Sequence, residues 1–129
     1  MLLNLTNHPS AGWGDEQMRS AVKCWGSVVD LPFPDVPPGY GDAQVAQYAV
    51  EVAKKAVALH PDAVLCQGEM TMAFALVQIL HMHGIPSYAA TSRRETVESV
   101  KDGIAQKQSV FRFERFRKYT VMDENKQGG

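Results

Sequence analysis

Residues 62–76, DAVLCQGEMTMAFAL, decide the predicted fold of this chain. The apolar run at 63–66 is typical of a buried strand, Gly68 interrupts it, and Met70 and Phe74 then follow at helical spacing. A strand, a glycine turn and a helix in this order form the core of an α/β unit. Ligands of such units bind beyond the end of the strand, where free N–H groups of the next helix point. The stretch therefore predicts both a fold class and the place of a site.

The same alternation continues on both sides of this stretch. We expect strands at 1–6, 27–33, 63–66 and 85–90, and helices at 15–25, 43–60 and from 70 to the stop at 84. Right-handed crossovers make these strands a parallel sheet of order 2-1-3-4 with helices on both faces. The fold class is α/β, a Rossmann-like three-layer sandwich.

A β-hairpin is expected to extend this sheet. After a loop at 91–94, strands at 96–100 and 109–119 flank a turn at 101–103. Phe116 falls on the wrong parity of its strand, which predicts a bulge near 114–115. The hairpin either widens the sheet or forms an oligomer contact. The domain spans 1–119, and the polar residues 120–129 are expected to form a flexible tail.

Composition narrows the classes of function. The contents of 45% hydrophobic and 21% charged residues are typical of a globular domain. The formal net charge of −1 gives no overall electrostatic attraction to DNA, RNA or membrane surfaces. No apolar run approaches the roughly 20 residues of a membrane helix, and a signal peptide is not indicated, so we expect a cytoplasmic protein. Cys24 and Cys66 do not suggest a disulfide. No Cys, His or Asp cluster has zinc spacing, and we expect neither a metal nor a cofactor.

Four loops should meet where the parallel strands end: 7–10, 33–40, 68–71 and 91–94. Three other histidines, His60, His81 and His83, are explained by the last turns of helices. His8 is not, and it acts either as a general acid or base or in a hydrogen bond that orders its loop.

Each of the other polar candidates has two interpretations. Glu69 either complements the start of its helix or holds a base amine or a hydroxyl, and Thr71 either caps that helix or reaches the ligand. Arg93 and Arg94 suit phosphate but could instead pair with Glu95 or Glu98. The rings of Trp13 and Tyr40 either stack on bases or cover the core. The remaining candidate ligand-binding residues are Asn7, Ser10, Gly68, Thr91 and Ser92.

Several segments together resemble a known group of proteins. They are NLTNHPS (4–10), DLPFPDVPP (30–38), GEMTMAFAL (68–76), ATSRR (90–94) and FRFERFRKY (111–119). They resemble small Rossmann-like accessory proteins of CRISPR systems, related to CARF domains, that handle cyclic oligoadenylate second messengers. The resemblance covers about residues 1–119.

The resemblance implies a homodimer that binds cyclic oligoadenylate across its two-fold axis. Some members of the group are ring nucleases that cleave this ligand without a metal, and others only sequester it. For cleavage by the ribose 2′-OH, His8 and Glu69 are candidates for acid, base or orienting roles, and Arg93 and Arg94 for charge stabilisation. We therefore expect a ring nuclease of type III CRISPR antiviral signalling. The alternatives are a non-catalytic binder of the same ligand and a structural assembly subunit.

Overall fold

The computed structural model describes residues 1–122, so most of the expected tail lies outside the described residues. Five strands form one sheet in the order β2-β1-β3-β4-β5. They are β1 (Leu2–Leu5), β2 (Val28–Asp30), β3 (Ala63–Cys66), β4 (Ser87–Lys101) and β5 (Ile104–Lys118). The first four are parallel and β5 is antiparallel to β4. The predicted α/β class and the strand order 2-1-3-4 are confirmed.

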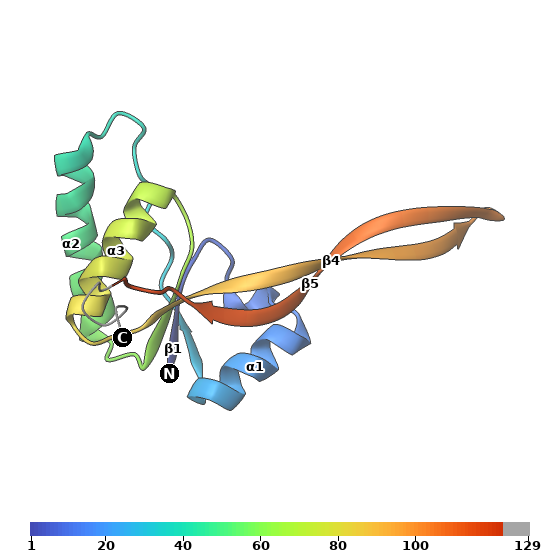
Figure 1. The fold of residues 1–129 in the computed structure, drawn as a ribbon, viewed down its shortest axis with the longest axis horizontal. Helices are drawn as coiled ribbons and strands as arrows, with labels where there is room; N and C mark the ends of the chain where they lie inside the picture. Colours follow the sequence, from blue (N-terminus) through green and yellow to red (C-terminus); the bar gives the residue numbers. More distant parts are fainter. Residues whose placement is uncertain (123–129) are drawn as a thin grey trace.

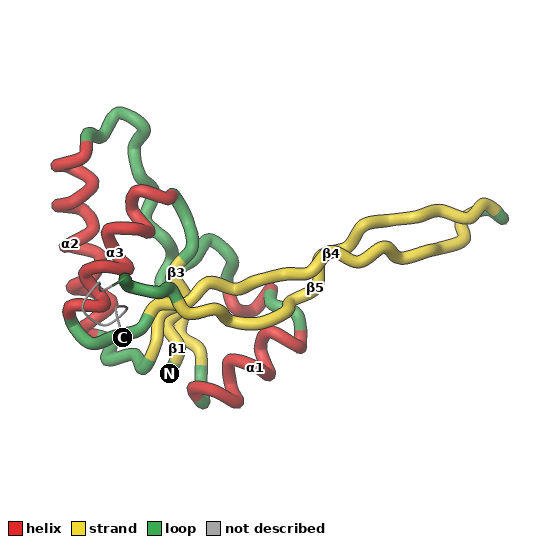
Figure 2. Tube along the Cα trace, in the orientation of Figure 1, coloured by secondary structure: helices red, strands yellow, loops and turns green. Residues whose placement is uncertain are grey.

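Helices cover both faces of the sheet (Figures 1 and 2). Helix α1 (Asp15–Trp25) lies on one face, and α2 (Asp42–Ala58) and α3 (Met70–Met82) lie on the other. Alternate residues of the central strands face the two sides: Leu3, Leu5 and Val64 pack against α2 and α3. Leu2 and Leu65 pack on the α1 side. This two-sided burial explains why the central strands are continuous apolar runs.

The hairpin is longer than the sequence suggested. We expected a strand at 85–90, a loop at 91–94 and a separate strand at 96–100, and this was wrong. β4 is one strand of 15 residues, and its residues 88–101 pair with β5 throughout. The pairing closes at a two-residue turn, Asp102 and Gly103, whose φ angles of 55° and 76° suit a type I′ hairpin turn. Because no glycine or proline interrupts 91–94, nothing ends the strand there.

The predicted bulge is confirmed. Thr91 pairs with Arg115 and Ser92 pairs with Phe113, which leaves Glu114 as the extra residue of β5. The bulge restores the parity of the aromatic residues, so that the rings of Phe113 and Phe116 lie 4.9 Å apart between centroids.

Beyond the bulge, the two strands extend away from the rest of the molecule as a twisted ribbon (Figure 1). We call residues 92–113 the β-arm and residues 1–91 with 114–122 the body.

Three smaller boundaries differ from expectation. The strand expected at 27–33 is only three residues long, and Phe33 leaves it to enter the core. Helix α2 is capped by Gly41 rather than by Asp42, and it ends at Ala58. His60 lies beyond that end with a φ of 52°, so it is not in a last helical turn.

Candidate functional site

A crevice of about 520 Å³ opens at the edge where β1 and β3 end and the β-arm begins. Its lining comprises Thr6, Asn7, His8, Gly12, Trp13, Gly14, Gln17, Leu65, Gln67, Gly68, Ala90 and Ser92. Five of the candidate residues meet here, from the segments after β1, the turn after β3, and β4. Among these twelve lining residues there is no Lys, Arg, Asp or Glu, so the crevice offers amides, hydroxyls, one indole and one imidazole.

The main chain at His8 is held from several sides. Its carbonyl oxygen accepts hydrogen bonds from Asn4 Nδ2 at 2.8 Å and from Trp13 Nε1 at 3.2 Å. Its N–H donates to Thr6 Oγ1 at 3.1 Å. The side chain of His8 is exposed, and no hydrogen bond to its ring is found within residues 1–122. Asn4, Thr6 and Trp13 therefore restrain the main chain of His8, while its imidazole is exposed at the crevice.

Asn4 and Asp30 organise the loop that carries His8. Asn4 is only 1% exposed, and its amide donates to Asp30 Oδ1 as well as to His8. Asp30 accepts from the backbone N–H and the hydroxyl of Ser10. Partial burial raises the pKa of Asp30, but the hydrogen bonds from Asn4 and Ser10 outweigh it and hold the pKa below its usual value. Ser10 therefore positions the loop and does not line the crevice.

Trp13 lies between the crevice and the aromatic residues beneath α1. Its ring is 6.2 Å from that of Phe116, centroid to centroid, in a tilted arrangement. Phe116 in turn contacts Trp25 edge-on at 5.4 Å. Trp13 thus serves both of its expected roles, since it covers part of the core and lines the crevice.

The turn after β3 is shaped by packing. A Cβ atom added at Gly68 would lie 2.4 Å from two ring atoms of Phe33, so only glycine fits above this ring. The neighbouring Gln67 accepts a hydrogen bond from the N–H of Ala90 through Oε1 at 2.9 Å. That bond ties the end of β3 to β4 and leaves the Gln67 amide nitrogen at the crevice.

Glu69 and Thr71 lie outside the crevice lining and cap α3. The Glu69 carboxylate accepts from the N–H groups of Thr71 and Met72 at 3.0 and 2.8 Å and from the Thr71 hydroxyl at 2.6 Å. These hydrogen bonds, from the Thr71 side chain first, lower the pKa of Glu69. The geometry matches the helix-capping alternative for both residues, and the deprotonated carboxylate is not a proton donor at neutral pH.

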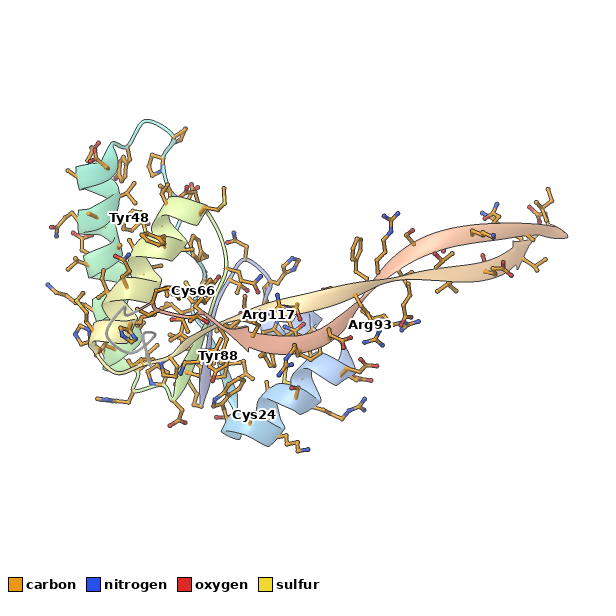
Figure 3. All side chains as sticks on the ribbon, viewed as in Figure 1. Cys24, Tyr48, Cys66, Tyr88, Arg93 and Arg117 are labelled. Atoms are coloured by element: carbon orange, nitrogen blue, oxygen red, sulfur yellow. The ribbon has the colours of Figure 1, made fainter. Side chains whose placement is uncertain are left out.

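Arg93 and Arg94 belong to the β-arm and lie outside the crevice lining. Figure 3 labels Arg93 on the hairpin. The guanidinium of Arg93 donates to Glu95 at 2.8 Å and to Glu114 at 2.6 Å, and both bonds raise its pKa. Glu95 also accepts from Arg112 at 2.6 Å. Arg94 donates to Ser109 Oγ at 3.1 Å. The interpretation of Arg93 as an ion-pair partner of Glu95 is the one that this geometry matches.

Two other candidates lie elsewhere. The Thr91 hydroxyl donates to the carbonyl of Arg115 at 3.0 Å, so it stabilises the bulge. Tyr40 contacts Tyr48 at 6.2 Å between ring centroids, in a separate hollow beside α2. Neither residue lines the crevice.

The sequence reading missed three polar residues of this region, Asn4, Gln17 and Gln67. A signal existed for two of them. Asn4 is a polar residue within an apolar strand, and Gln67 is the first polar residue after the buried run of β3. Both positions are where a side chain reaches the carboxyl edge of a parallel sheet. Gln17 comes from the first turn of α1 and had no such signal.

Other reactive groups do not extend the site. Cys66 is buried, and burial raises the pKa of its thiol to about 12. Cys24 is exposed on α1 and is not among the residues that line the crevice. Within residues 1–122, no group of three or more His, Cys, Asp or Glu residues is arranged to hold a metal ion. Nor does that part of the chain contain a helix both long and apolar enough to cross a membrane.

Comparison with known proteins gives one match. The model of the family described as "Uncharacterized protein MJ1673 family" matches residues 1–117, which includes the whole sheet except the last residue of β5. No curated protein and no solved structure matches the chain. The matched region contains the crevice and the β-arm together. By this match over most of its length, the chain belongs to the MJ1673 family.

Proposed function

We propose that the crevice binds cyclic oligoadenylate and that the protein is a metal-independent ring nuclease of type III CRISPR signalling, acting as a cytoplasmic homodimer. The observation that carries the proposal is the position of His8. It is the one titratable side chain among the twelve lining residues, and its main chain is fixed by Asn4, Thr6 and Trp13. The resemblance of the segments around these residues to CRISPR accessory proteins supports the choice of ligand.

The lining suits an adenine nucleotide. Asn7, Gln17 and Gln67 offer amide groups that can pair with the edge of adenine, and Trp13 offers a ring against which a base can stack. Ser92 offers a hydroxyl to a ribose or a phosphate. A volume of about 520 Å³ is that of an ordinary small-ligand site, so a cyclic tetranucleotide extends beyond one crevice and needs a second copy.

Cleavage requires one proton to be removed and one to be supplied. The ribose 2′-oxygen attacks the neighbouring phosphorus, a new P–O bond forms, and the bond to the 5′-oxygen breaks. The products are a linear oligonucleotide with a 2′,3′-cyclic phosphate and a free 5′-hydroxyl. Either the neutral imidazole of His8 removes the 2′-OH proton and a water molecule protonates the leaving 5′-oxygen, or the protonated imidazole supplies that proton and a water molecule accepts the one from the 2′-OH. All other bonds that form or break in the cleavage lie within the ligand.

A second candidate is a binder that does not cleave. Glu69 is engaged as a helix cap, and Arg93 is paired with two carboxylates. Two groups that we had assigned to acid-base chemistry and charge stabilisation are thus already occupied within one copy. A crevice without them binds the ligand through its amides and Trp13 but stabilises the transition state poorly. A third candidate, a structural assembly subunit, needs neither binding nor cleavage.

Incubation of the purified protein with cyclic tetra- and hexa-adenylate, with and without EDTA, separates the three candidates. The ring nuclease gives linear product in both conditions, and the products are resolved by chromatography. The binder gives saturable binding and no product. If neither ligand binds, the proposed function is wrong.

The variant that tests the role of His8 is His8→Ala, with His81→Ala as a matched control on the far end of α3. We expect the single-turnover rate to fall about 100-fold or more in His8→Ala, with little change in affinity. A Trp25→Phe variant leaves Trp13 as the single tryptophan, so quenching of its fluorescence reports ligand at the crevice. Cleavage by His8→Ala at the parent rate would remove His8 from the mechanism.

A further inference from the structure

We propose that the β-arm exchanges between two copies of this chain: each arm lies along the other, and its tip packs on the first turns of α3 in the partner's body. The inference concerns an interface and does not require the ligand of the proposed function. It gives the homodimer of that proposal a specific geometry.

Among residues 1–122 of one copy, no surface supports the arm. Figure 1 shows it extending away from every helix of the body. A two-stranded ribbon alone is marginally stable in water. The arm also exposes large apolar side chains near its tip and along its length: Val100 is 75% exposed, Ile104 65% and Phe111 73%. A ribbon of this kind is stabilised when another surface covers it.

The length of the arm matches the size of a second body. The nine residues 93–101 span about 30 Å at the rise of an antiparallel strand. A globular body of about 100 residues has a radius of gyration of about 13 Å, and hence a width of about 30 Å. Each arm can therefore reach across the space between two bodies.

The body has an apolar surface of its own that nothing in residues 1–122 covers. Met70 and Phe74, in the first turns of α3, are 83% and 68% exposed, and they line a groove of about 700 Å³. The α3 segment contains no Asp, Glu, Lys or Arg, which is unusual for an exposed helix face. This groove and the tip of the arm are chemically alike, and both lack a partner within residues 1–122 of one copy.

Charge favours the encounter of an arm with a body. Residues 87–118, the whole hairpin, carry eight Lys and Arg against four Asp and Glu. Residues 1–86 carry four Lys and Arg against eight Asp and Glu. The β-arm itself carries five Lys and Arg against three Asp and Glu, and the body carries seven against nine, so the pairing of an arm with a second body brings opposite net charges together.

Two-fold symmetry decides where the tip lies. When two arms run antiparallel, the tip of each meets the point where the other leaves its body. That point is the edge of the sheet that also holds the crevice and the start of α3. Lys101 and Lys107, near the tip, would then supply cations beside a crevice whose lining has none. This last step rests on the proposed function, because cations beside the crevice matter only if the ligand is an anion.

Light scattering on the full chain tests the assembly first. We expect twice the chain mass of 14.2 kDa. Replacing residues 97–108 by Asn-Gly, which keeps the pairing up to Thr96 and Ser109, should halve the mass while the cooperative thermal transition is retained. Phe74→Asp should raise the dimer dissociation constant at least tenfold. The matched control Val50→Asp, on the exposed side of α2, should not.

Crosslinking tests the docking surface. In a Cys24→Ser background, cysteines at Val100 and Phe74 should join two chains on mild oxidation or with a short bismaleimide, whereas cysteines at Val100 and Val50 should not. A full-length monomer would overturn the inference. A dimer that survives both the arm replacement and Phe74→Asp would overturn it as well. A dimer with the expected crosslink that binds no cyclic oligoadenylate would leave this inference standing and would refute the proposed function alone.

Discussion

Replacement of Gly68 by alanine tests what the turn after β3 is for. The sequence makes this glycine a candidate ligand-binding residue, whereas the structure shows a ring of Phe33 in the space where a side chain would lie. Two carbon atoms in contact prefer a separation of about 3.5–4.0 Å, and the added Cβ would be 2.4 Å from the ring. The ring or the turn must therefore move by about 1 Å. Phe33 is buried in the core, so such overpacking should cost about 1–3 kcal/mol.

Urea denaturation measures this cost directly. We expect the midpoint to fall while the slope m stays unchanged, because the native fold and the exposed area are the same. For a chain of 129 residues, each kcal/mol lowers the melting temperature by about 4 °C, so a decrease of about 4–12 °C should accompany it. All variants are compared at one protein concentration, since association also contributes to stability. Gly39→Ala is the control, because a Cβ there meets nothing within 4 Å.

A double-mutant cycle identifies the cause. If the clash with Phe33 is responsible, Phe33→Leu should remove much of the penalty, and the coupling energy between the two positions should be about 0.5–3 kcal/mol. A Gly68→Ala variant as stable as Gly39→Ala would show that the Phe33 ring does not restrict position 68. Loss of ligand affinity at full stability would mean that the glycine serves the ligand after all.

Three other substitutions test the hydrogen bonds described above. Tyr119→Phe removes the bond from the tyrosine hydroxyl to the carbonyl oxygen of Cys66 at 2.7 Å, which should lower the free energy of unfolding by about 1 kcal/mol in urea titrations. Glu69→Gln should reduce the fall in the free energy of unfolding that accompanies acidification. Because the pKa of Glu69 is lowered in the folded protein, its capping bonds contribute their full stability above the unfolded pKa, and this contribution is lost as the pH falls through the lower folded pKa. Asn4→Ala removes two donated hydrogen bonds from a buried site, which should cost about 1–3 kcal/mol and speed the hydrogen exchange of the His8 amide.

The fold could be predicted because its signals are local and consistent. The apolar runs of β1 and β3 and the helical periodicity between them leave one arrangement of strands and crossovers. The bulge at Glu114 was also visible, because a single extra residue shifts the alternation of Phe113 and Phe116. The length of β4 could not be predicted from the sequence. The polar residues of 91–94 read as a loop, but their hydrogen bonds are supplied by β5 and their side chains lie on a ribbon open to water.

The candidate site could be predicted in position but only partly in composition. Position follows from topology, since the segments after parallel strands meet at one edge. Which polar group faces that edge depends on side-chain partners. Glu69 turns toward its own helix, and Arg93 turns toward Glu95 and Glu114. Asn4 enters the region from within a strand. Each of these side chains has both a neighbour along the chain and the crevice within reach, and the spacing of residues does not reveal which partner it takes.

The distribution of charge connects the crevice with the β-arm. The crevice lining has no charged group other than the ionisable His8, while the β-arm holds five of the thirteen basic residues of the chain. An anionic ligand in the crevice of one copy is therefore poorly neutralised until an arm lies beside it. If the arm beside it belongs to a second copy, ligand binding and dimer formation share a free energy of coupling, and each must strengthen the other by the same factor. The neutral crevice of one copy and the basic arm of the other then form one binding site.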